Sequence, residues 1–123
     1  MLLNDLYLIE SQTVTDNFLQ ATVKLNADHA IFKGHFPGHP VLPGVCMMEM
    51  IAEISGEYVQ KSFRISGVPL IKFLRMIDPN KDPIIKLEIK YQPAVEHILT
   101  NGKIFSDSDI FMKFQIILLS DPV

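Results

Sequence analysis

Hydrophobic and polar residues alternate along the segment from Phe18 to Leu25. Apolar side chains occupy every second position there, and Gln20, Thr22 and Lys24 lie between them. A period of two residues is typical of a β-strand with one buried face. The same alternation recurs cleanly in the second half of the chain over Ile85–Tyr91. We also predict strands there at Pro69–Ile77, Ile98–Phe105 and Phe111–Leu119.

A loop rich in proline and glycine precedes the strongest helical segment. Residues 34–44 contain three prolines and three glycines, which exclude a helix or a central strand. The next residues contain neither and are rich in Met, Glu, Ala and Ile, so we predict a helix over Val45–Ser55, with Gly56 placed where it ends or bends. Apolar residues surround nearly the whole helix, which predicts burial on most sides.

The N-terminal residues allow two interpretations, because their apolar positions are compatible with a short helix or with an edge segment. These positions are Leu2, Leu3, Leu6, Tyr7 and Ile9. One long buried helix followed by successive antiparallel strands predicts an α+β layer fold in which the sheet covers the helix. The length of 123 residues is that of one domain, so we expect residues 1–123 to form a single domain.

The composition argues against several classes of protein. A net charge of −3, from 11 basic and 14 acidic residues, argues against a general nucleic-acid-binding surface. The single cysteine, Cys46, excludes a disulfide framework within the chain and fits a reducing compartment. No apolar stretch approaches the length of about 20 residues that spans a bilayer, and the N-terminus lacks the positive charge of a secretory signal. We therefore expect a cytoplasmic protein that has no membrane partner.

Three groups in the loop and the helix have the chemistry of an acid–base site. His35 stands beside proline and glycine residues that restrict the backbone, as a pre-positioned general base requires. The helix start at Gly44 offers N–H groups and the positive end of the helix dipole to a developing oxyanion. Glu49 lies in a helix of core residues, where desolvation raises a carboxyl pKa and lets the group donate a proton. Taken alone, each residue has a structural role more often than a catalytic one.

The histidines do not predict a metal site. His29, His35 and His39 have spacings that match no standard ligand pattern. No second cluster of Cys or Asp accompanies them, so we expect no bound metal.

The combination of these residues is more specific than any one of them. The segment HFPGHPVLPGV at residues 35–45, followed by Glu49, resembles the active-site signature of the β-hydroxyacyl-acyl carrier protein dehydratases of the FabZ and FabA type. Phe32 and Gly34 before the loop, and residues 72–75 after the helix, resemble further positions of that family. The resemblance implies a dimeric hot-dog fold, in which an antiparallel sheet wraps a long central helix.

The resemblance also implies a reaction. The family dehydrates 3-hydroxyacyl thioesters to trans-2-enoyl thioesters in fatty acid or related lipid and polyene synthesis. By position, His35 would remove the proton alpha to the thioester carbonyl and Glu49 would protonate the departing β-hydroxyl. The Gly44 N–H would bind the thioester oxygen, and Val45 would line the same place. The two catalytic side chains come from opposite subunits, and no metal or redox cofactor takes part.

The implied substrate is delivered by acyl carrier protein or as a CoA thioester, and the implied assembly is a homodimer or a higher oligomer. Carrier proteins are acidic, so docking requires a basic surface on this chain. The candidate residues for that surface are Lys33, Lys61, Arg64, Lys72 and Arg75.

Glu53 departs from the family, which usually has glutamine four positions after the acid. On a helix, Glu49 and Glu53 share a face, and two nearby carboxyls raise the pKa of at least one. We expect Glu53 to face solvent, with tuning of Glu49 as the alternative. Two other functions stay open: an acyl thioesterase of the same fold, in which the acid activates water, and a non-catalytic acyl-binding protein that forms heterodimers.

Overall fold

The computed structural model describes residues 1–34 and 38–121. His35, Phe36 and Pro37 therefore lie outside the described residues. The elements, in chain order, are β1 (Tyr7–Thr15), β2 (Phe18–Leu25), α1 (Ile31–Gly34), α2 (Gly44–Val59), β3 (Phe63–Phe73), β4 (Ile84–Pro93), β5 (Ile98–Phe105) and β6 (Ile110–Ser120).

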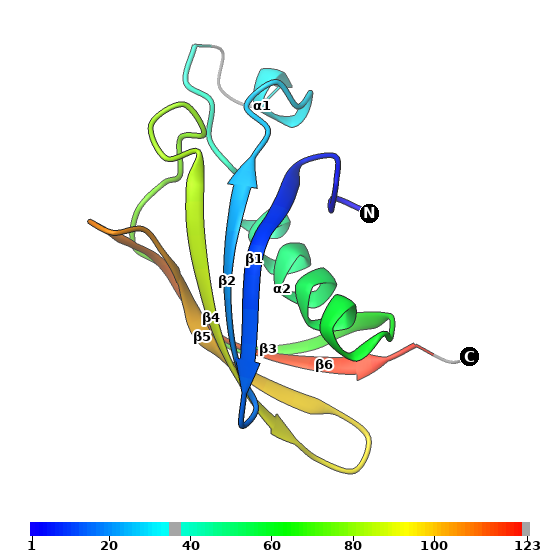
Figure 1. The fold of residues 1–123 in the computed structure, drawn as a ribbon. Helices are drawn as coiled ribbons and strands as arrows, with labels where there is room; N and C mark the ends of the chain where they lie inside the picture. Colours follow the sequence, from blue (N-terminus) through cyan, green and yellow to red (C-terminus); the bar gives the residue numbers. More distant parts are fainter. Residues whose placement is uncertain (35–37, 122–123) are drawn as a thin grey trace.

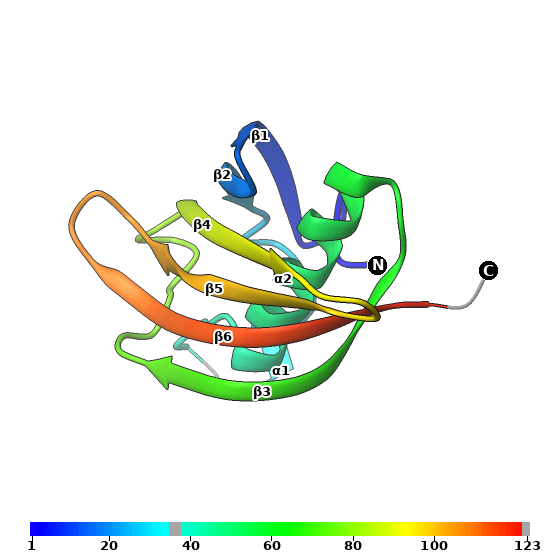
Figure 2. The ribbon, with the colours of Figure 1, turned by 90° about the horizontal axis from the view of Figure 1, so that it is seen from below.

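The strands form one antiparallel sheet that curves around α2 (Figures 1 and 2). Their order is β1-β2-β4-β5-β6-β3, so β1 and β3 are the two edge strands. One row of strand partners crosses the sheet from Ala21 through Leu87, Ile104 and Met112 to Phe73. The first four of these side chains are buried, because alternate residues of each strand face the helix. The row ends at the β3 edge, beside the start of α2.

Helix α2 supplies the other half of the core. Met50, Ile51 and Ile54 have no exposed surface, as the predicted burial on most sides requires. The helix is longer than predicted and continues through Gly56 to Val59, and Gln60 ends it with a left-handed φ of 56°. Gly56 does not end the helix. Its lack of a side chain lets the chain after the helix pass close by, since a Cβ there would lie 2.4 Å from the carbonyl oxygen of Lys61.

The predicted strands correspond to the observed ones with one exception. β2 and β5 have the predicted bounds, and β4 and β6 are longer by one or two residues at each end. The strand predicted over Pro69–Ile77 is wrong at both ends, because β3 begins at Phe63 and ends at Phe73. β3 is an edge strand with register shifts around Gly67, and the regular alternation of half-buried and exposed residues from Phe63 is lost after Val68. After β3, the amides of Leu74 and Arg75 both donate to the Phe111 carbonyl, and the chain leaves the sheet.

The N-terminal segment leads into edge strand β1, so its interpretation as an edge segment is confirmed and the short helix is wrong. The predicted α+β class is confirmed, with a long central helix wrapped by an antiparallel sheet in the hot-dog arrangement. Within residues 1–34 and 38–121, no helix combines the length and the apolar character needed to cross a membrane.

Candidate functional site

The start of α2 leaves backbone N–H groups without a cap. Pro43 is the N-cap residue, and no side chain of residues 1–34 or 38–121 caps the helix there. The amides of Cys46 and Met47 donate to the Pro43 carbonyl at 3.0 and 3.2 Å. The earlier amides, those of Gly44 and Val45, have no partner within the helix. They can therefore donate to a negatively charged or polarised oxygen, which the helix dipole also favours.

The loop before α2 is held in place by the segment that follows β3. Gly38 has a φ of 81°, in the left-handed region that favours glycine. Leu42 is buried, and its amide donates to the Ile77 carbonyl at 2.9 Å. Residues 38–43 form no helix or strand, as their proline and glycine content predicts.

Phe73 lies against Gly44 at the mouth of an apolar groove. A Cβ on Gly44 would lie 2.6 Å from Cζ and 2.8 Å from Cε1 of the Phe73 ring, closer than a real Cβ contact. The groove has a volume of about 430 Å³, and Leu42, Met47 and Leu74 also line it. Val45 does not line this groove and has 73% of its surface exposed. The helix start thus combines free N–H groups with a mostly apolar surface.

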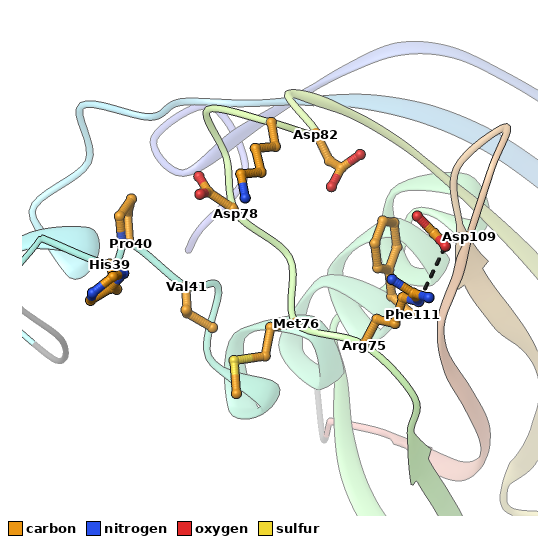
Figure 3. Close-up of a pocket in the computed structure, with 10 residues that line it drawn as sticks. His39, Pro40, Val41, Arg75, Met76, Asp78, Asp82, Asp109 and Phe111 are labelled. Atoms are coloured by element: carbon orange, nitrogen blue, oxygen red, sulfur yellow. Dashed lines mark ion pairs between the residues drawn. The ribbon is translucent and has the colours of Figure 1, made fainter.

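A second groove adjoins the first along the same loop. Figure 3 shows His39 and Val41 on one side of it, and Arg75 next to Asp109 and Phe111 on the other side. This groove has a volume of about 570 Å³. The Arg75 Nε lies 3.2 Å from Asp109 Oδ1, so the arginine is already paired. Among the described residues, no group of three His, Cys, Asp or Glu side chains could hold a metal ion.

Glu49 lies on the second turn of α2 and is exposed. It lines a groove of about 340 Å³ with Ala52, Glu53 and Phe63, and this groove shares no residue with the groove at Gly44. Within one chain, the structure therefore does not bring Glu49 and Gly44 into the same groove. Partial burial of the Glu49 carboxyl raises its pKa, and the negative charge of Glu53 raises the pKa further.

Glu53 is buried, with 8% of its surface exposed, so the expectation that it faces solvent is wrong. Its Oε2 accepts a hydrogen bond from the Leu2 amide at 2.8 Å. Its Oε1 accepts from the Leu3 amide at 2.9 Å and from the Tyr7 hydroxyl at 3.0 Å. These three donors offset the desolvation of the carboxylate, and the N-terminal segment that supplies them is far away in sequence.

Tyr7 and Phe73 are the residues that sequence reasoning missed at these sites. Burial and the adjacent Glu53 raise the pKa of Tyr7, which keeps its phenol neutral and able to donate. The only sequence signal for Tyr7 was its place among apolar N-terminal residues. Phe73 belonged to a recognised segment, but nothing in the sequence placed its ring against Gly44.

Comparison with known proteins gives a family match and several relatives that match part of the chain. The family model described as ApeI-like, ApeI dehydratase, matches residues 11–108. The 3-hydroxyacyl-(acyl-carrier-protein) dehydratase FabZ of Syntrophomonas wolfei is 37% identical over 86 residues, which cover 64% of this chain and 58% of that protein. The FabZ of Clostridium acetobutylicum is 39% identical over 67 residues, covering 49% and 46%. The chain thus spans about half the length of these relatives.

Two solved structures have the same fold. The dehydratase heterocomplex ApeI:P from Xenorhabdus doucetiae superposes with a TM-score of 0.71 at 16% identity, covering 91% of this chain and 96% of that one. A hypothetical thioesterase with coenzyme A from Streptococcus pneumoniae has a TM-score of 0.65 at 13% identity, covering 94% and 85%.

Proposed function

Because the chain belongs to the ApeI-like dehydratase family, we propose that it dehydrates 3-hydroxyacyl thioesters to trans-2-enoyl thioesters. The observation that carries this proposal is the family match over residues 11–108, which includes the loop at 35–44 and Glu49. The uncapped helix start at Gly44 and the raised pKa of Glu49 support it.

The proposed reaction needs a base and an acid. The His35 imidazole takes the proton from Cα, and that electron pair forms the Cα=Cβ double bond. The Cβ–O bond breaks as the Glu49 carboxyl transfers its proton to the departing oxygen, and water leaves. The role of His35 rests on the sequence motif, because this residue lies outside the described ones. The role of Glu49 agrees with a raised pKa, which favours the protonated form that donates.

The thioester oxygen becomes more negative as the α-proton leaves. We place it at the Gly44 N–H, with Val45 beside it, because this amide lies at the positive end of α2 and has no intrahelical partner. An apolar surround strengthens such a hydrogen bond, and Phe73 and Met47 supply one in the adjoining groove.

We propose that two copies of the chain assemble through β3. This strand is at the sheet edge and exposes apolar side chains at Val68, Leu70 and Phe73. An edge of this kind is a template for pairing with another chain. Within one chain, Gly44 and Glu49 line separate grooves. In a dimer, Glu49 of one subunit would complete the site at Gly44 of the other. A different chain as partner, as in the solved ApeI:P heterocomplex, is the alternative.

The proposed carrier is an acidic protein, for which the outer sheet face offers a row of lysines. Lys72 of β3 is the direct partner of Lys113 of β6, which is the partner of Lys103 of β5. Like charges placed opposite one another destabilise a sheet. Within residues 1–34 and 38–121, only Lys103 of this row is paired with an acid, Glu88 at 3.8 Å. An acidic carrier would neutralise the remaining two. Of the other docking candidates, Arg64 and Arg75 are paired with aspartates.

The test is an assay of the purified chain with 3-hydroxyacyl groups of several lengths on carrier protein and on CoA. We expect an enoyl product by ultraviolet absorbance and no release of free thiol. Thiol release without enoyl product would identify a thioesterase, and binding without turnover would identify a non-catalytic partner. Sedimentation at several concentrations measures the dimer, and a mixture of His35→Ala and Glu49→Gln chains should regain activity only if subunits share a site.

Carrier docking has a separate test. Lys113→Glu should raise KM for the carrier-bound substrate about tenfold and leave KM for a small thioester unchanged. Lys24→Glu on β2 is the control, and an equal effect of both variants would contradict the proposed surface.

A further inference from the structure

Glu53 is a buried charged residue that the proposed reaction does not use. It has three hydrogen-bond donors, from Leu2, Leu3 and Tyr7, and all of them come from the N-terminal segment. A carboxylate accepts hydrogen bonds and cannot donate them, so this set of donors matches the ionised form. The arrangement fixes a negative charge within the layer between α2 and β1.

The segment that Glu53 holds is itself ordered by short backbone bonds. The amides of Asp5 and Leu6 donate to the Leu2 carbonyl at 3.0 and 2.7 Å, and the Asn4 amide donates to the Tyr7 carbonyl at 2.7 Å. Leu6 and Tyr7 are buried. The carboxylate therefore ties a compact turn, and with it the start of β1, to the middle of α2.

Glu49 precedes Glu53 by one helical turn on the same face of α2. Both line the groove of about 340 Å³, in which Lys61 of the following loop also lies. Among the described residues, the other titratable groups near Glu49 are the Glu57 carboxyl in the same groove, the Tyr7 phenol, the Cys46 thiol and the Met1 ammonium. The phenol and the thiol stay neutral because their pKa values are raised, and the ammonium opposes Glu53 by lowering the pKa of Glu49.

Building on the proposed function, we propose that Glu53 is a positioning residue for Glu49. It anchors residues 2–7 beside the acid and holds a fixed negative charge one turn away, which keeps the Glu49 proton in place until the substrate takes it.

The experiment compares Glu53→Gln with Glu57→Gln. Both variants remove one charge from α2, but Glu57 lies a further turn from Glu49 and is exposed. Loss of the Glu53 charge should lower the titration midpoint of the Glu49 carboxyl, followed by carbon NMR, by about 0.5 to 1 pH unit. The rate of Glu53→Gln should match the parent at low pH, where Glu49 is protonated in both. At high pH it should fall about three- to tenfold below the parent.

Glu57→Gln should change neither readout. An unchanged Glu49 midpoint in a folded Glu53→Gln variant, or equal midpoint changes in both variants, would overturn the proposal. If the parent has no dehydratase activity, the proposed function fails, but the NMR titration still decides the inference.

The parent protein supplies a test in case Glu53→Gln does not fold. The amides of Leu2 and Leu3 donate to the buried Glu53 carboxylate, so they should be protected from hydrogen exchange in the parent. Rapid exchange of these two amides would contradict the anchor.

Discussion

The Phe73 ring lies against the Cα of Gly44, so that the last residue of edge strand β3 covers the first residue of α2. The contact leaves no room for a side chain at position 44. It also places an aromatic surface beside the free N–H groups of the helix start, where the thioester is proposed to bind. Glycine at this position therefore lets the ring approach the helix start this closely.

Gly44→Ala should displace the Phe73 ring and lower the activity. The new Cβ would lie 2.6 Å from the ring, but the ring is half-exposed and able to move. We therefore expect a stability loss of about 1 kcal/mol, at the low end for overpacking, and a larger relative loss of kcat/KM. Thermal unfolding and steady-state kinetics measure the two effects.

Gly34→Ala is the matched control, because a Cβ there meets no atom of the described residues within 4 Å. The double variant Gly44→Ala with Phe73→Ala should recover the stability lost through the clash. Equal effects of the two single alanine substitutions would show that the Phe73 contact is not the cause.

Glu49→Gln should abolish most turnover and leave the fold intact. Removing a general acid costs about 10²- to 10⁴-fold in rate, and the side chain is exposed, so packing changes little. The measurement is kcat for enoyl formation, with circular dichroism as the control for folding. Turnover within twofold of the parent would exclude Glu49 as the acid.

The pKa of Glu49 predicts a pH dependence of stability with a definite sign. The folded state raises this pKa above the ordinary value of 4.5, so the folded protein binds the proton more tightly than the unfolded chain. The resulting stabilisation is complete below pH 4.5 and is lost as the pH rises through the folded pKa.

Chemical denaturation of the parent and Glu49→Gln across this range measures the effect. The parent should lose stability relative to the variant as the pH rises. A constant difference between the two proteins would contradict the raised pKa.

Tyr7→Phe should destabilise the protein, although it removes only the hydroxyl group and leaves no large cavity. The substitution removes the hydroxyl that donates to Glu53 at 3.0 Å, in a fully buried position. The amides of Leu2 and Leu3 still donate hydrogen bonds to the Glu53 carboxylate. We therefore expect a loss of about 1 to 2 kcal/mol in the free energy of unfolding. Urea denaturation measures it. Tyr58→Phe, at an exposed tyrosine of α2, is the control and should be neutral.

The sequence by itself determined the elements whose patterns are local. The alternation from Phe18 to Leu25 predicted β2 to the residue, and composition predicted both the loop before Gly44 and the helix after it. These features depend on backbone preferences and on which residues share a face, and both properties are encoded in neighbouring positions. The motif at residues 35–45 and Glu49 identified the family for the same reason.

Only the tertiary structure decided the environment of Glu53, the contact of Phe73 with Gly44 and the bounds of β3. A glutamate on a helix is usually exposed, and its burial here depends on amides from Leu2 and Leu3, about fifty positions away in the sequence. β3 is an edge strand with register shifts around Gly67, and its alternation is interrupted there, so no regular alternation marks where the strand ends. Long-range contacts of this kind depend on how the sheet closes around the helix, and no pattern among neighbouring residues predicts them.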